Sequence, residues 1–222
     1  MKIIGHRGAR GLAPENTLKS ILKALNHNVD EIEFDVRATK DGIIVLCHDE
    51  ALIDASGNRL VIKNTKYMDL LEHKKDLARL DQAIELVNKK TPLHIEIKPG
   101  EPASKVIKII KSYLNKGWKN SDFLIASYDV SILLEAQQKL PDIRRVVIEK
   151  WSSFRATRHA KQVNTKRLSM NHLWLWSFFI KSMSKSGWQL SAYTLNDPKI
   201  AKKWAKYGLY GVVTDFPDQF EN

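Results

Sequence analysis

Short apolar runs alternate with helix-spaced segments along the whole chain, and this alternation limits the fold more than any other feature. The run KIIGH at 2–6 has the length of a strand, and the segment after it places Leu18, Ile21 and Leu25 on one helical face. About eight such alternations fit into 222 residues, and roughly 200 residues or more suffice for one (β/α)8 barrel. A doubly wound open sheet has the same periodicity. We predict the α/β barrel, known as the TIM barrel.

No stretch rich in proline, glycine or serine marks a linker, so residues 1–222 are predicted to form one domain. The alternation is interrupted at residues 50–76, which we interpret as a short insertion with a hairpin around the sequence ASGN. Before it, the runs at 31–36 and 43–48 are strand candidates, and the pair Asp41-Gly42 between them indicates a turn.

Polar side chains occupy alternate positions in two predicted strands, and they therefore share one face of each strand. They are Glu31, Glu33 and Asp35 in the first strand, and His94, Glu96 and Lys98 in the second. Parallel strands of α/β folds are usually buried on both faces, where carboxylates are costly without a compensating partner. Half-buried antiparallel strands would also explain the pattern, so the alternation alone leaves both interpretations open.

Several polar residues fall near the carboxyl ends of apolar runs, which is where α/β barrels carry their active sites. Three carboxylates, Glu33, Asp35 and Glu96, form an oxygen-rich set that suits Mg²⁺ or Ca²⁺. Fixed positive charge for a phosphate comes from Arg7 and Lys98. Two histidines, His6 and His48, can divide the removal and the donation of a proton. Such a set predicts metal-assisted cleavage of a phosphate ester.

An ordered series of motifs along the chain indicates a protein family with this chemistry. The series is GHRG, PENT, EIEFDVRATKDGIIVLCHD, IEIKP, IASYD, YTLND and GVVTDFPD. In this order it resembles the glycerophosphodiester phosphodiesterase family over essentially the whole chain. The resemblance implies a (β/α)8 barrel with a small insertion, for which residues 50–76 would be a short version. Tyr128 and Tyr193 depart from the family pattern, and they leave the choice of substrate open.

The resemblance also implies roles for the individual residues. His6 and His48 would be the acid–base pair, although the sequence does not assign which of them acts as the base. The metal, Mg²⁺ or Ca²⁺, would be held by Glu33, Asp35 and Glu96, and the phosphate by Arg7 and Lys98. In the family the glycerol 2-hydroxyl is thought to attack phosphorus and expel the head-group alcohol. The resulting cyclic phosphate is then opened by water, so the products are glycerol 3-phosphate and an alcohol.

Neighbouring polar residues have simpler interpretations. Glu31 is expected in a salt bridge inside the barrel. His94 is expected either as an interior side chain with its hydrogen bonds satisfied or as a residue that supports the site residues without touching the substrate. The motif PENT at 14–17 is predicted to start a helix and to brace the loop that carries Arg7. For Asp215, support of the site and formation of a turn are equally good alternatives.

The net charge of +11, from 36 Lys and Arg against 25 Asp and Glu, attracts polyanions or acidic lipid surfaces. The lysines are scattered, which favours a solvated basic surface, and we expect no nucleic-acid partner. The single cysteine, Cys47, excludes an intrachain disulfide, and we recognise no signal peptide. The longest apolar stretch, at 173–180, is too short to span a bilayer. These features predict a cytoplasmic protein, and they do not indicate its oligomeric state.

The aromatic run LWLWSFF at 173–179 is predicted to be mostly a buried helix face. Some of it would line an apolar wall at the barrel mouth, where it would suit a lysophospholipid tail and transient contact with a lipid surface. The sequence therefore leaves two alternatives beside hydrolysis of small glycerophosphodiesters. One is a lysophospholipase D activity on the same residues, and the other is a non-catalytic basic barrel that binds polyanions.

Overall fold

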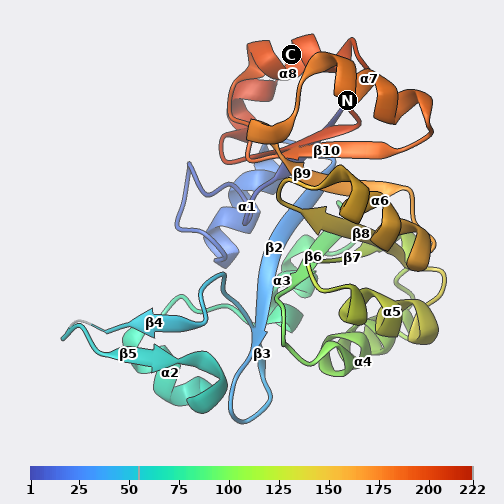
Figure 1. Cartoon of the computed structure of the whole chain (residues 1–222). Coiled ribbons are helices and arrows are strands. Elements are labelled where there is room, and N and C mark those ends of the chain that lie inside the picture. Colours follow the sequence, from blue (N-terminus) through green and yellow to red (C-terminus); the bar gives the residue numbers. More distant parts are fainter. Residues whose placement is uncertain (55, 222) are drawn as a thin grey trace.

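Eight parallel strands close into a barrel in the computed structural model, which describes residues 1–54 and 56–221 (Figure 1). The strands are β1 (Lys2–Gly5), β2 (Glu31–Ala38), β6 (Leu93–Ile97), β7 (Phe123–Ser127), β8 (Arg144–Glu149), β9 (Arg167–Asn171), β10 (Gln189–Tyr193) and β11 (Gly211–Thr214). They pair in this order, and β1 pairs with both β2 and β11, which closes the ring. The prediction of a (β/α)8 barrel is confirmed, and an open sheet is excluded.

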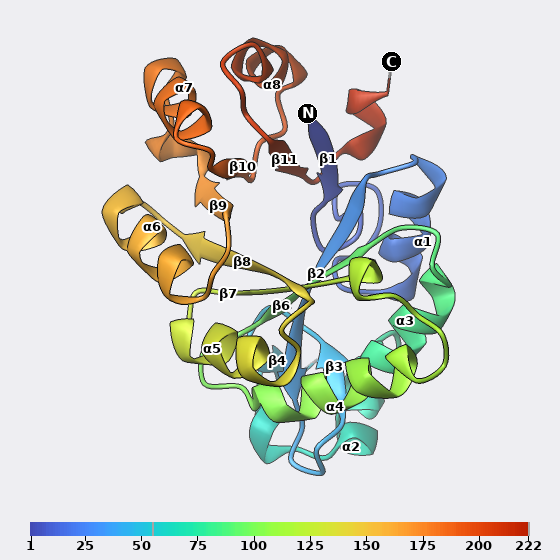
Figure 2. The same cartoon turned by 90° about the vertical axis from the view of Figure 1, so that its right-hand side faces the viewer.

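Helices connect successive strands and cover the outside of the barrel (Figure 2). They are α1 (Leu18–Asn26), α3 (Leu80–Val87), α4 (Ala103–Leu114), α5 (Val130–Lys139), α6 (Ser153–Gln162), α7 (Ser177–Lys185) and α8 (Pro198–Ala205). After β11 the described chain ends with a 3-10 turn, η4 (Pro217–Phe220). The outward side chains of the strands, such as Ile32, Phe34 and Val36, pack against these helices in the main core.

The run at 43–48 is a strand as predicted, but it lies outside the barrel. It forms β3 (Ile44–Leu46), which pairs antiparallel with the end of β2. Since β2 itself pairs in parallel with β1 and β6 and is buried on both faces, half-buried antiparallel strands do not explain its carboxylates.

Residues 50–76 form the predicted insertion, seen beside β3 in Figure 1. It contains the hairpin strands β4 (Ala51–Ile53) and β5 (Arg59–Val61), the turn η1 (Ile62–Asn64) and the helix α2 (Tyr67–His73). The two strands pair antiparallel, which confirms the hairpin, although Ala55 of its turn lies outside the described residues. The insertion packs against β3 around a small second core that includes Val45 of β3 together with Ile62 and Leu70.

The aromatic run LWLWSFF is not a buried helix face, and this prediction is wrong. Helix α7 begins only at Ser177, so the first half of the run lies in the turn η3 (His172–Trp174) and the following loop. Leu175 is buried, whereas most of the other large side chains of the run are exposed. Apolar spacing alone does not distinguish a helix face from a loop that follows a strand, because apolar residues can be closely spaced along the sequence in both.

An ion pair deep in the barrel confirms the expectation for Glu31. The Arg167 guanidinium donates to both carboxylate oxygens of Glu31, at 2.7 and 2.9 Å. Burial would raise the pKa of Glu31, but the contacts with His94 and Arg167 lower it to about 2. His94 is buried as expected, yet its Nδ1 lies 3.4 Å from Glu31 and makes no hydrogen bond, so it is not fully satisfied.

Replacing Arg167 with methionine is expected to destabilise the fold by about 3–5 kcal/mol, because it leaves the Glu31 charge buried without its main partner. Urea unfolding at neutral pH measures this loss. The double variant Glu31→Leu/Arg167→Met is the matched control, and it should recover most of the stability. Since the pKa of Glu31 is lowered from 4.5 to about 2, the wild-type contribution is present above pH 4.5 and lost as pH falls toward 2. Breaking a buried ion pair is expected to cost several kcal/mol. If the free energy of unfolding of Arg167→Met lies within about 1 kcal/mol of the wild-type value, this account is contradicted.

No helix in the described ranges is both long enough and apolar enough to cross a membrane.

Candidate active site

A cavity of about 360 Å³ opens at the carboxyl ends of the barrel strands. All seven residues singled out from the sequence line it: His6, Arg7, Glu33, Asp35, His48, Glu96 and Lys98. They come from segments far apart in the chain, namely the end of β1, the middle of β2, the end of β6 and the segment after β3. Closure of the barrel brings these segments together, since all eight barrel strands point the same way.

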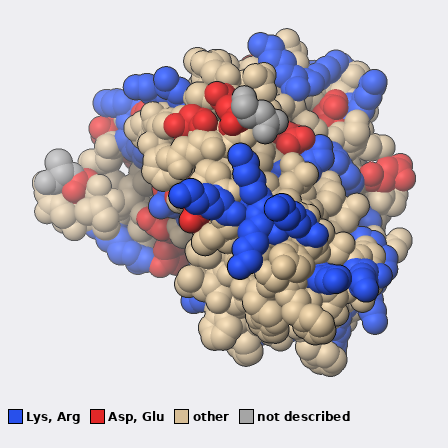
Figure 3. Space-filling model, turned by 90° about the horizontal axis from the view of Figure 1, so that it is seen from above, with Lys and Arg blue, Asp and Glu red and all other residues tan. Residues whose placement is uncertain are grey.

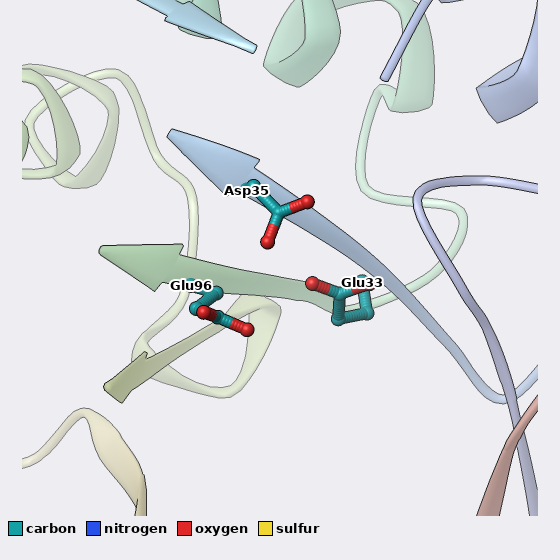
Figure 4. Close-up of side chains that lie close together, drawn as sticks. All are labelled: Glu33, Asp35 and Glu96. Carbon is teal, nitrogen blue, oxygen red and sulfur yellow. The ribbon is translucent and has the colours of Figure 1, made fainter. Parts of the chain in front are cut away.

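Three of the residues that line this cavity are carboxylates that lie close together (Figure 4). Glu33, Asp35 and Glu96 each offer one oxygen, and these oxygens all lie within 4.8 Å of one another. Asp35 and Glu96 are direct neighbours across the β2–β6 pairing. Burial and the neighbouring carboxylates raise the pKa of Glu33 well above its ordinary value, and burial with the Asp35 charge raises that of Glu96 to about 7.

These shifts show that the three side chains do not easily carry three negative charges together. A divalent cation among them would offset the repulsion, and oxygen donors are the ligands that hard cations prefer. The three residues therefore fit a metal of the Mg²⁺ or Ca²⁺ type, both in chemistry and in proximity.

Two cations sit against the carboxylates. Lys98 Nζ lies 2.6 Å from Asp35 Oδ1 and 2.5 Å from Glu96 Oε1, and Arg7 Nε lies 3.2 Å from Asp35 Oδ2. Burial opposes ionisation of Asp35, but the charges of Lys98 and Arg7 hold its pKa below the ordinary value. Arg7 and Lys98 thus bring fixed positive charge to the same cavity as the acidic cluster, as an anionic substrate group requires.

The loop after β1 is tightly built around Arg7. The Arg7 amide donates to Glu33 Oε2 at 2.9 Å, and its guanidinium donates to Glu15 Oε1 at 2.6 Å. The next residue, Gly8, has φ of +82°, and a Cβ there would come within 2.5 Å of the Ser20 backbone. Gly8, the second glycine of the GHRG motif, therefore allows the loop to pass this close to helix α1.

The motif PENT does start α1, as predicted, since the Thr17 hydroxyl caps the helix by accepting from the Ser20 amide. Its asparagine has a second contact that the sequence does not reveal. Asn16 Nδ2 donates to Asp35 Oδ2 at 2.9 Å, and the Asp35 amide donates to Asn16 Oδ1 at 3.1 Å. Asn16 therefore orients one of the three carboxylates directly.

His6 follows β1 and is held by a residue from the other end of the chain. His6 Nδ1 lies 2.6 Å from Asp215 Oδ1, and both side chains are nearly buried. Burial lowers the pKa of His6, although Asp215 acts in the opposite direction. Of the two alternatives for Asp215, the structure favours support of the site, because its second oxygen accepts from Asn196 Nδ2 at 2.9 Å. Asp215 thus occupies the Nδ1 side of the ring, and Nε2 is the nitrogen on its other side.

His48 lies in a more open position at the cavity wall. Its side chain is 39% exposed, and its Nδ1 lies 2.8 Å from Asp49 Oδ1. A hydrogen bond from β2 holds the backbone at His48, since Arg37 Nε donates to the His48 carbonyl at 3.0 Å. The two histidines thus differ in environment, with His6 enclosed and His48 accessible.

Other lining residues were not recognised as site residues from the sequence. Tyr128 and Tyr193 were identified only as departures from a motif, yet their hydroxyls lie 2.6 Å apart at the cavity wall. Arg10 also lines the cavity, with its Nε 3.2 Å from Asp215. The available signal was position, since Tyr193 ends β10 and Tyr128 directly follows β7.

Comparisons with known proteins agree with this geometry. The model of the Glycerophosphoryl diester phosphodiesterase family matches residues 6–219. The protein YhdW of Bacillus subtilis strain 168 is 29% identical over 98% of this chain and 96% of its own length. Human lysophospholipase D GDPD1 is 26% identical, over 100% of this chain and 85% of its own. A solved Oleispira antarctica phosphodiesterase, in complex with the product sn-glycerol-3-phosphate, is 25% identical with a TM-score of 0.86 and covers 99% of this chain and 94% of its own.

Proposed function

Because the chain belongs to the glycerophosphoryl diester phosphodiesterase family, which makes it a phosphodiesterase, we propose that it hydrolyses glycerophosphodiesters to glycerol 3-phosphate and an alcohol. The observation that carries this proposal is one cavity whose lining includes His6 and His48, the clustered carboxylates Glu33, Asp35 and Glu96, and the cations Arg7 and Lys98. The similar structure that holds sn-glycerol-3-phosphate supports a product of this size and charge. We assign the activity to a single domain, residues 1–222, acting in the cytoplasm.

The proposed cofactor is a divalent cation, Mg²⁺ or Ca²⁺, held by Glu33, Asp35 and Glu96. When bound, the cation supplies positive charge that stabilises negative charge developing on the phosphoryl oxygens. Arg7 and Lys98 bind the phosphate and add to this stabilisation from the chain itself. Both cations lie against Asp35, so their charges are positioned beside the acidic cluster.

The two histidines divide the proton transfers. His6, whose pKa is lowered by burial, is neutral near pH 7 and takes the proton from the glycerol 2-hydroxyl as its oxygen bonds to phosphorus. His48 donates a proton to the alcohol oxygen as the bond from phosphorus to that oxygen breaks. Water then opens the cyclic phosphate, with the two histidines in reversed roles. Asp215 keeps the His6 ring oriented through both steps.

A substrate that lacks the 2-hydroxyl tests this sequence of steps. Release of choline from glycerophosphocholine is expected at least 10²-fold faster than from the 2-deoxy analogue, because the attacking oxygen is part of the substrate. Free choline, measured with purified protein and added metal, is the readout. Equal rates on both compounds would contradict attack by the 2-hydroxyl, and absence of turnover on every glycerophosphodiester would contradict the proposed function.

Lysophospholipids are the second candidate substrate, favoured by apolar side chains in the same cavity, among them Ile148 and Leu173. The similarity to human lysophospholipase D GDPD1 supports this candidate as well. Comparing kcat/KM for glycerophosphocholine and lysophosphatidylcholine separates the two, since an acyl chain that contacts the wall raises the second value. The non-catalytic basic barrel is set aside, because the chain belongs to a family of enzymes.

A further inference from the structure

The exposed aromatic residues of this protein are concentrated beside the cavity. Six large apolar side chains from two neighbouring loops and helix starts form what is here named the apolar rim: Trp151, Phe154, Leu173, Trp174, Trp176 and Phe178. Their exposed fractions lie between 53% and 77%, and among the described residues no other tryptophan or phenylalanine is comparably exposed. Monomeric soluble proteins rarely leave such a group uncovered without a partner.

The rim lies at the end of the barrel where the cavity opens. It follows β8 and β9, which are paired neighbours, so their carboxyl ends and the loops after them are adjacent. Leu173 belongs to both features, because it is 76% exposed and also lines the cavity. A surface that covers the rim would therefore face the cavity mouth.

The charge of this region is of one sign. From Lys150 to Asn196 the chain contains eight lysines and arginines and no aspartate or glutamate. Within the part of the chain that the structure describes, only Arg155 and Arg167 of the eight form ion pairs, with Glu149 and Glu31. Lys150, Arg158 and Lys181 are exposed on the same loop and the same two helices, α6 and α7, as the rim. Tryptophan and phenylalanine interleaved with basic residues are typical of protein surfaces that rest on anionic lipid.

A second copy of the chain fits this surface less well. A two-fold contact would set the acid-free region against itself, and like charges facing each other oppose association. The lipid surface has the complementary charge and accepts the aromatic side chains at the level of its head groups.

We propose that the apolar rim docks this protein onto the surface of an anionic phospholipid bilayer, with the cavity mouth turned toward the lipid. The rim enters the head-group region with its aromatic side chains, and Lys150, Arg158 and Lys181 contact lipid phosphates. The contact is peripheral and reversible, and it goes beyond the proposed hydrolysis, since it does not require turnover.

Binding to vesicles tests the apolar part of the surface. Full-length protein is sedimented with vesicles of equal phosphatidylglycerol and phosphatidylcholine, and Trp174→Ser/Phe178→Ser is expected to bind about tenfold or more weakly than wild type. The matched control is Ile53→Ser/Met68→Ser, which removes two exposed apolar side chains from the insertion and should bind like wild type. Neither pair of residues lines the cavity, and circular dichroism with thermal unfolding reports on the folding of all variants independently of turnover.

A second comparison separates docking by the rim from attraction of the whole basic protein. Lysine and arginine side chains also gather on the face formed by α7 and α8, seen from above in Figure 3. The variant Lys150→Gln/Arg158→Gln/Lys181→Gln should lose binding. In contrast, Lys199→Gln/Lys202→Gln/Lys203→Gln, with the same charge removed from α8, should bind nearly as wild type.

Equal loss in the two triple variants, or equal binding of the serine variants, would overturn the proposal. It would also be overturned if wild type ignored anionic vesicles but formed dimers that Trp174→Ser/Phe178→Ser abolishes, since the rim would then join two copies. Because the readout is binding, failure here leaves the proposed hydrolysis untouched, and absence of turnover leaves the docking test valid.

Discussion

Replacing His6 with alanine is expected to lower kcat for glycerophosphocholine by about 10²–10⁴-fold, the range for loss of a positioned general base. The side chain is nearly buried, and its Nδ1 is fixed by Asp215, so no other group of the loop takes over its proton transfer. Because the ring lines the cavity and the strand before it is fully paired, KM should change much less than kcat. Steady-state release of choline at saturating metal gives both constants.

Asp215→Asn is the matched control for this variant, since it keeps the shape of the partner and removes its charge. Burial lowers the pKa of His6 while Asp215 raises it, so loss of the carboxylate lowers that pKa further. The base must be neutral to act, and the acid limb of the kcat/KM profile should therefore move to lower pH, with a smaller loss of rate than in His6→Ala. An unchanged acid limb, or His6→Ala within tenfold of wild type, would contradict the role of His6 as base.

The barrel and its site could be predicted in large part because most of the motif residues lie on a barrel strand or directly after one. Glu33 and Asp35 lie on one strand and Glu96 on the next barrel strand, so parallel pairing of these two strands is enough to bring the three carboxylates together. Alternation of side chains along a strand likewise indicates which residues face inward. Both arguments depend only on local pattern and on the common direction of the strands.

What the sequence did not reveal depends on contacts between distant segments. The carboxylate of Asp215 meets His6 across 209 positions, and Asn16 meets Asp35 through two hydrogen bonds that no spacing predicts. The exposed run around Trp174 was misjudged for another reason. Whether an apolar segment is covered depends on where its helix begins, and that boundary is the weakest part of a prediction from periodicity.

Removing divalent cations is expected to abolish turnover, with a loss of at least about 10³-fold, because a metal supplies several kcal/mol of transition-state stabilisation. The arrangement of charges gives the reason. Burial and like charge raise the pKa of Glu33 and of Glu96, so the cluster on its own favours protonation instead of three charged carboxylates. Lys98 lies against two of the carboxylates and only partly offsets their charge.

The most direct test of the proposed site is choline release from glycerophosphocholine by protein treated with EDTA, before and after Mg²⁺ or Ca²⁺ is restored in excess. Asp35→Asn, which removes one charge from the cluster with little change of shape, is measured beside wild type. We predict no turnover in EDTA, recovery with one of the cations for wild type, and no comparable recovery for Asp35→Asn. Full turnover in EDTA, or equal recovery of both proteins, would contradict a metal-dependent phosphodiesterase site built on Glu33, Asp35 and Glu96.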